Sequence, residues 1–192
     1  MKKIFLGLMV LLMSACSLGV ASTPKEKVKE FLDKYKNQDS SVLNDLDEIV
    51  SNEYSGDYAD RYKNIMKKQY KNLSYTITDE IIEGDSATVI AEITVYNYAS
   101  AIASANSYLS SNKSEFLLKD DTNSEGTDST TNITSETIDY DKFNDYKLSS
   151  LENVTDTKTY SITITFNKVN DKWVMNNLSD IDIEKIHGLY QE

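Results

Sequence analysis

The chain has 192 residues, and its 20 lysines and arginines stand against 31 aspartates and glutamates, giving a formal net charge of −11 at pH 7. This charge disfavours binding to nucleic acid and to anionic lipid surfaces. The single cysteine, Cys16, excludes an internal disulfide, and the single histidine, His187, excludes a zinc site built from several histidines. A Ser-His-Asp triad would have to use His187.

The N-terminal residues have the pattern of an export signal. Two lysines precede the apolar run Ile4–Met13, and the small residues Ser14 and Ala15 precede Cys16. The apolar run is shorter than the roughly 20 residues that a membrane-spanning helix needs. We therefore expect a signal peptide over residues 1–15 that is removed, and no retained transmembrane anchor.

The segment Leu12–Cys16 resembles the lipobox of a bacterial lipoprotein signal. This resemblance implies that Cys16 is acylated, as by palmitate, and that the chain is cut before it. Residues 16–24 would then form a lipidated tether on the extracytoplasmic side of the cell membrane. Cleavage removes two lysines, so the net charge changes from −11 to −13. The acyl chains would hold the protein at the membrane, since each buried CH₂ group contributes about 0.8 kcal/mol. The alternative is a secreted protein without a lipid anchor.

Three amphipathic helices are predicted after the tether. Pro24 is suited to the first turn of a helix over Lys25–Lys36, where apolar residues recur at helical spacing. Asp39 or Ser40 can cap a second helix that carries apolar residues through Val50. A third helix is predicted over Tyr58–Leu73, with lysines on its exposed face.

The hydrophobic period then changes from helix to strand. Alternating residues predict a hairpin from strands Leu73–Ile81 and Val89–Val95 around Gly84. A second hairpin is predicted from Tyr160–Phe166 and Trp173–Leu178.

The segments between and after the two hairpins lack the alternating pattern of strands. Ala99–Lys119 predicts a helix, Asp120–Glu136 a polar loop, and Ile138–Leu151 a short helix or irregular packing arm. Ser179 is expected to cap a closing helix with an apolar side that reaches Tyr190.

Helices at the N-terminal end and antiparallel hairpins predict an α+β fold, with a curved antiparallel sheet packed against the N-terminal helices. The helix Lys25–Lys36 and the hairpins Ser74–Tyr96 and Thr159–Leu178 resemble the cystatin-like, NTF2-like superfamily, in particular its small Gram-positive lipoproteins. On this reading residues 25–192 form a single domain with an insertion over about 99–153. The resemblance implies a binding or accessory module more readily than an enzyme, and fold by itself does not decide function.

Aromatic residues are the main candidates for a ligand-binding site. Among the 13 tyrosines, Tyr54, Tyr58 and Tyr62 recur at the spacing of one helix face, and Tyr96 and Tyr98 are expected on one strand face. Rings with polar tips suit a sugar or a peptide in a concave sheet, although they equally suit a core. Together with one carboxylate, the candidate ligand-binding residues are Tyr58, Tyr62, Tyr96, Tyr160, Trp173 and Glu92.

Paired carboxylates are the basis of an enzyme alternative. Asp79, Glu80 and Glu92 could serve as acid and base, and Glu92 points either to solvent or into the concave face. No spacing distinguishes any of them, so no catalytic residue is assigned. The lone His187 reads as a packing or surface residue.

An acidic run in the polar loop has part of a calcium-loop pattern. Asp121, Asn123 and Glu125 stand at positions 1, 3 and 5, but Asn132 stands where a bidentate glutamate is needed. A solvated acidic linker fits better, so neither a metal nor a cofactor is expected.

These observations predict a membrane-anchored extracytoplasmic lipoprotein with a non-catalytic binding or accessory domain. Its expected partners are the membrane, through Cys16, and a small ligand, a peptide or an envelope protein, and not nucleic acid. The alternatives are a small enzyme that uses a pocket carboxylate, and an envelope scaffold that presents the loop over residues 120–136.

Overall fold

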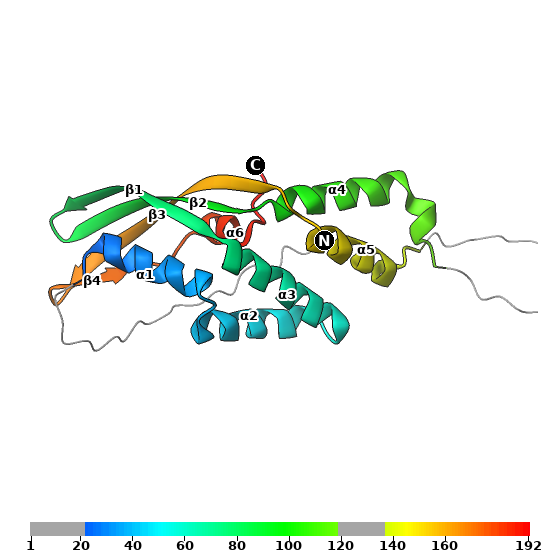
Figure 1. Ribbon diagram of the computed structural model, residues 1–192, viewed down its shortest axis with the longest axis horizontal. Helices are drawn as coiled ribbons and strands as arrows, with labels where there is room; N and C mark the ends of the chain where they lie inside the picture. Colours follow the sequence, from blue (N-terminus) through cyan, green and yellow to red (C-terminus); the bar gives the residue numbers. More distant parts are fainter. Residues whose placement is uncertain (1–21, 119–136) are drawn as a thin grey trace, which may run out of the picture.

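The computed structural model describes residues 22–118 and 137–192, and it has the predicted α+β architecture (Figure 1). Cys16 and the acidic run at residues 121–132 lie outside the described residues. The elements are α1 (Pro24–Lys36), α2 (Ser40–Glu53), α3 (Asp57–Asn72), β1 (Ser74–Glu83), β2 (Ser86–Tyr96), α4 (Tyr98–Ser111), the 3₁₀ turn η1 (Lys113–Phe116), α5 (Tyr140–Glu152), β3 (Thr157–Val169), β4 (Lys172–Met175) and α6 (Asp180–His187).

Local capping explains where the N-terminal helices begin. The Thr23 side chain accepts a hydrogen bond from the Glu26 backbone N–H, and the Glu26 carboxylate accepts one from the Thr23 backbone N–H. This capping box, with Pro24 in the first turn, starts α1. Asp39 caps α2 through the Ser41 backbone N–H at 2.9 Å. The three predicted N-terminal helices are confirmed.

The sheet is an antiparallel meander in the order β1-β2-β3-β4, with α4, η1 and α5 inserted between β2 and β3. Both hairpins turn at residues with positive φ, Gly84 in the first and Asn170 and Asp171 in the second. Such residues match the right-handed twist of the flanking strands. The final strand is shorter than predicted: β4 ends at Met175 rather than at Leu178. The chain leaves the sheet there to reach the cap of α6 at Ser179.

A helix is confirmed in the inserted segment, but its predicted end and the predicted strand position of Tyr98 are wrong. The helix expected over Ala99–Lys119 ends at Ser111, because the backbone N–H and the side-chain amide of Asn112 both donate to the Tyr108 carbonyl and close the last turn. Tyr98 is not on a strand with Tyr96, because the Asn97 side chain caps α4 and Tyr98 is its first residue.

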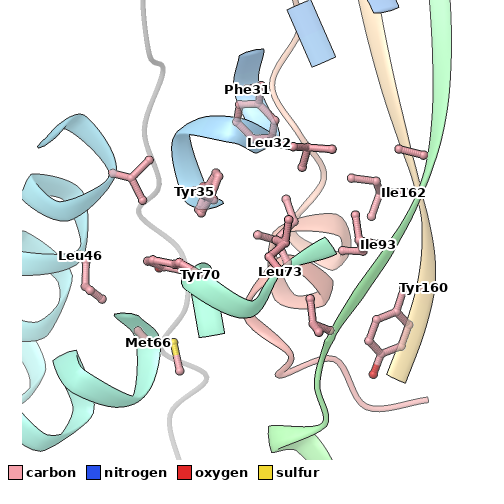
Figure 2. Close-up of a cluster of buried hydrophobic side chains, with 14 of the residues drawn as sticks. Phe31, Leu32, Tyr35, Leu46, Met66, Tyr70, Leu73, Ile93, Tyr160 and Ile162 are labelled. Carbon is pink, nitrogen blue, oxygen red and sulfur yellow. The ribbon is translucent and has the colours of Figure 1, made fainter. Parts of the chain in front are cut away.

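The main core lies between the inner face of the sheet and helices α1, α3 and α6. Alternate residues of β2 and β3 are buried, as their period predicted. Figure 2 shows side chains from α1 and α3 converging on Ile93 and Ile162 of the sheet. The outer face carries exposed residues, mainly threonine and serine, on the same two strands.

Helices α4 and α5 form an arm that extends away from the sheet (Figure 1). The arm has its own small core of Ala105, Phe116 and Phe143. Near its tip, the Leu118 backbone N–H donates to the Thr137 carbonyl at 2.9 Å. The arm is therefore closed at that point by a main-chain contact.

Candidate functional site

The structure does not gather the predicted aromatic residues at one place. Tyr160 is buried in β3, where its ring meets that of Tyr190 with centroids 5.7 Å apart. Trp173 pairs with Lys168, eight residues further along β3 than Tyr160, which at about 3.3 Å per residue is roughly 26 Å. Tyr160 and Trp173 therefore cannot contact one ligand of small size.

The concave face of the sheet is filled by the helices, and Glu92 does not point into it. Glu92 lies opposite Ser161 on the exposed outer face, and Asp79 is exposed on the same side of the sheet. Glu80 has a structural contact instead: its carboxylate accepts a hydrogen bond at 2.9 Å from the Lys25 backbone N–H in the first turn of α1. These three carboxylates do not share a pocket.

Two further predicted residues make contacts between elements. The Tyr58 hydroxyl on α3 donates to the Asp141 carbonyl of α5 at 3.0 Å. The ring of Tyr96, at the end of β2, lies under the Lys68 ammonium, which is 4.8 Å from the ring centroid. Both residues therefore contribute to holding the arm and the sheet against α3.

A pocket of about 230 Å³ lies where α3, α4, α5 and α6 come together. It contains one residue of the predicted ligand site, Tyr62. Its walls combine an aromatic pair, four aliphatic side chains and two opposite charges. The lining residues are Tyr54, Tyr62, Ile102, Lys147, Leu148, Leu151, Glu184 and Leu189.

The aromatic wall is a stacked pair. The rings of Tyr54 and Tyr62 have centroids 5.0 Å apart and an interplanar angle of 24°. The spacing predicted that Tyr54 shares a helix face with Tyr58 and Tyr62, and this prediction is wrong. It follows the last residue of α2, and Gly56, at φ +59°, turns the chain so that the Tyr54 ring packs back onto α3.

The charges of the pocket come from two helices. Lys147 is on α5, and its ammonium lies 5.9 Å from the centroid of the Phe143 ring. Partial burial lowers the pKa of Lys147. Glu184 is on α6. Within residues 22–118 and 137–192, neither side chain forms a salt bridge.

Helix α5, which carries Lys147, is fixed to α3 by the only arginine of the sequence. The Arg61 guanidinium donates to both carboxylate oxygens of Glu152, at 2.8 and 3.1 Å, and to Asp145 at 2.8 Å. Arg61 also lowers the pKa of Glu152, through the hydrogen bonds first and the opposite charge second. Lys68 adds two hydrogen bonds to the carbonyls of Glu152 and Val154.

Helix α6, which carries Glu184, is fixed by buried polar contacts. The buried side chain of Gln69 donates to the Ile186 carbonyl at 3.1 Å and accepts from the Tyr96 backbone N–H at 2.9 Å. His187 is buried, with Nδ1 3.1 Å from the Tyr70 hydroxyl. Burial lowers the pKa of His187 to about 4, so the ring is neutral at pH 7. The prediction of a packing residue is confirmed for His187.

The sequence did not reveal most of the pocket. Lys147, Glu184 and Ile102 stand in three different helices, and each reads as an ordinary residue of an amphipathic pattern. Only their tertiary arrangement places them around one space.

No model of a known protein family matches the chain, and no curated protein is similar to it in sequence. The structure is similar to the crystal structure of a Bacillus subtilis protein, ycdA, which is provisionally described as a lipoprotein. The TM-score is 0.39 and the sequence identity 16%. The similarity covers 89% of this chain and 48% of ycdA, so this chain spans about half the length of that protein.

The helices of the described residues are too short or too polar to cross a bilayer.

Proposed function

We propose that this protein is an extracytoplasmic lipoprotein, anchored to the cell membrane through Cys16, with a non-catalytic domain that binds a small ligand. On this proposal its helices and meander sheet are a variant of the cystatin-like, NTF2-like arrangement. The pocket between α3, α4, α5 and α6 carries the ligand-binding part of the proposal. It offers aromatic and aliphatic walls together with two charges that form no salt bridge within the described residues.

A binding role accounts for the pocket better than the enzyme alternative. That alternative used a carboxylate such as Glu92 in the concave sheet, whereas Glu92 is exposed on the outer face. Most known small-molecule sites are largely apolar with a few placed polar groups, and this pocket has that composition. The combination supports ligand capture at the membrane surface.

The anchor is tested by replacing its cysteine. The wild-type chain is expected in the membrane fraction of a bacterial host, with a mass that includes the acyl groups on Cys16. Cys16→Ser is expected to lose that mass increment and to leave the membrane or remain as the uncut precursor. Equal membrane retention and equal lipid mass in both chains would contradict the anchor.

The pocket is tested by filling it. Ile102→Trp places a larger side chain in the pocket, and Ile81→Trp, on the outer face of β1, is the matched control. Small molecules extracted from each purified, membrane-derived protein are compared by mass spectrometry. We expect a molecule that is recovered from the wild type and from Ile81→Trp and is lost from Ile102→Trp. The same set of molecules from all three proteins would contradict the pocket as the site.

A further inference from the structure

The two charges of the pocket restrict the chemistry of its ligand. Lys147 is partly withdrawn from water, and an ammonium in that position gains from a carboxylate that comes with the ligand. Glu184 is a potential partner for a cationic group. Because they stand on separate helices and do not pair with each other, one ligand that carries both charges can satisfy both.

The uncharged walls of the pocket restrict the chemistry of the rest of the ligand. Ile102, Leu148, Leu151 and Leu189 offer only hydrocarbon, and the stacked Tyr54–Tyr62 pair offers aromatic surface. A sugar would bring several hydroxyl groups, and each one that met an aliphatic side chain without a partner would cost about 1–3 kcal/mol. A hydrocarbon or aromatic group gains from the same surface. A volume of about 230 Å³ suits a small molecule and is below the usual range for drug-sized ligands, about 300–1,000 Å³.

We propose that the ligand is a zwitterionic amino acid with a large apolar or aromatic side chain. Its carboxylate pairs with Lys147, its ammonium pairs with Glu184, and its side chain packs against the aliphatic residues and the tyrosine pair. This inference rests on the proposed ligand-binding function and adds the class of ligand to it.

The experiment is calorimetric titration of the full lipoprotein in detergent with four probes. L-Phenylalanine carries both charges, phenylalaninamide lacks the carboxylate, N-acetylphenylalanine lacks the ammonium, and L-alanine lacks the large side chain. L-Phenylalanine is expected to bind most tightly. The loss of either charge should weaken binding by about tenfold or more, since hydrogen bonds to charged groups contribute about 1.5–3 kcal/mol.

Variants assign each charge to its residue. Lys147→Met should weaken phenylalanine binding by about tenfold or more and leave phenylalaninamide binding unchanged, because that probe has no carboxylate to lose. Glu184→Gln should weaken phenylalanine binding by a similar factor and leave N-acetylphenylalanine binding unchanged, because that probe has no ammonium to lose. Lys172→Met, on the exposed end of β4, is the matched control. Unchanged affinity for the unaffected probe also shows that each variant is folded.

The outcomes separate this inference from the pocket itself. Equal binding of phenylalanine and both blocked analogues would overturn it. So would the absence of amino-acid binding when another class of molecule is recovered from the wild type and lost in Ile102→Trp, and in that case the pocket function would stand. Absence of both amino-acid binding and any pocket-dependent molecule would overturn both proposals.

Discussion

Gly188 stands at a crowded point between α6 and the end of the sheet. Its φ is +71°, and it ends α6 in the left-handed conformation that glycine adopts without steric cost. Its carbonyl accepts a hydrogen bond from the Ala99 backbone N–H at 2.8 Å. An added Cβ would overlap the carbonyl oxygen of Tyr96 and lie 2.9 Å from the Gln69 amide nitrogen. The residue therefore has both a conformational and a packing requirement for glycine.

We predict that Gly188→Ala lowers the free energy of unfolding by about 2–4 kcal/mol. An alanine there would have a strained backbone at positive φ, and its Cβ would overlap the Tyr96 carbonyl oxygen. Urea denaturation measures this loss. Gly84→Ala is the control, because its φ is +60° but its Cβ position has nothing within 4 Å. The control should lose only about 1 kcal/mol. Equal losses at the two positions would show that the packing around Gly188 contributes nothing.

His187 links stability to pH. In the folded protein its pKa is about 4, because burial disfavours the imidazolium, whereas its unfolded value is 6.5. The unfolded state therefore binds more protons between these values, and the stability that neutral His187 contributes is complete above pH 6.5. It is lost as the pH falls towards 4, by about 3 kcal/mol in total.

We predict that His187→Gln removes most of this dependence, since glutamine cannot take up a proton. The free energy of unfolding of both proteins is measured by urea denaturation from pH 7 to pH 4. The wild type should lose more stability than the variant over that interval. Parallel curves would mean that the protonation of His187 does not drive the loss.

At the scale of elements, the pocket depends on the contact between α3 and α5. Arg61 joins the two helices with a paired hydrogen bond to Glu152 and a single one to Asp145. Its side chain is 21% exposed, so solvent screens these ion pairs only in part. A planar guanidinium can make this set of contacts, and a lysine ammonium, as a point charge, cannot reproduce it.

We predict that Arg61→Lys destabilises the protein by about 1 kcal/mol and increases hydrogen exchange along α5, although it keeps the charge. Lys63→Met is the control. It breaks a single exposed bridge from α3 to Asp47 and should cost less than about 0.5 kcal/mol. If the two variants cost the same, the paired geometry at Arg61 adds nothing beyond an ordinary surface bridge.

At the scale of the whole molecule, the described residues bury two separate hydrophobic clusters. The larger cluster joins α1, α2, α3 and α6 to the sheet and also includes Tyr98 at the start of α4 and Leu148 and Leu151 of α5. The smaller cluster joins the outer parts of α4 and α5 to η1. The pocket lies at the edge of the larger cluster, since Tyr62, Leu148 and Leu151 of its walls belong to that cluster and Ile102 packs against it. Because the outer part of the arm has a cluster of its own, that part can open locally while the sheet stays folded.

We predict that Phe143→Ala, which truncates the smaller cluster, raises hydrogen exchange in the arm and leaves the protection of β2 and β3 unchanged. A loss of about 3–5 kcal/mol is typical for a buried phenylalanine, and here it should appear as local opening of the arm. Ile162→Ala, in the larger cluster, is the control and should raise exchange across the molecule. Loss of protection in β2 and β3 of the Phe143 variant would show that the clusters unfold as one.

Much of the architecture can be read from local patterns. The spacing of Val28, Phe31, Leu32 and Tyr35 predicts α1, and the strict alternation over Tyr160–Phe166 predicts the buried face of β3. The expected helix Ala99–Lys119 was too long because its apolar pattern continues past Asn112. A cap made by that side chain on Tyr108 is not visible in hydrophobic periodicity.

The sequence by itself determined the α+β class, the order of the elements, the buried face of each central strand and the prediction of a lipid anchor at Cys16. These follow from residue spacing, turn chemistry and short motifs, which act over a few neighbouring residues. Only the tertiary structure decided that helices fill the concave face, that Glu92 points to solvent, and that Lys147 and Glu184 share a pocket with Tyr62. The crossing of helices that are distant in sequence makes that pocket, and such crossings depend on packing complementarity rather than on local pattern.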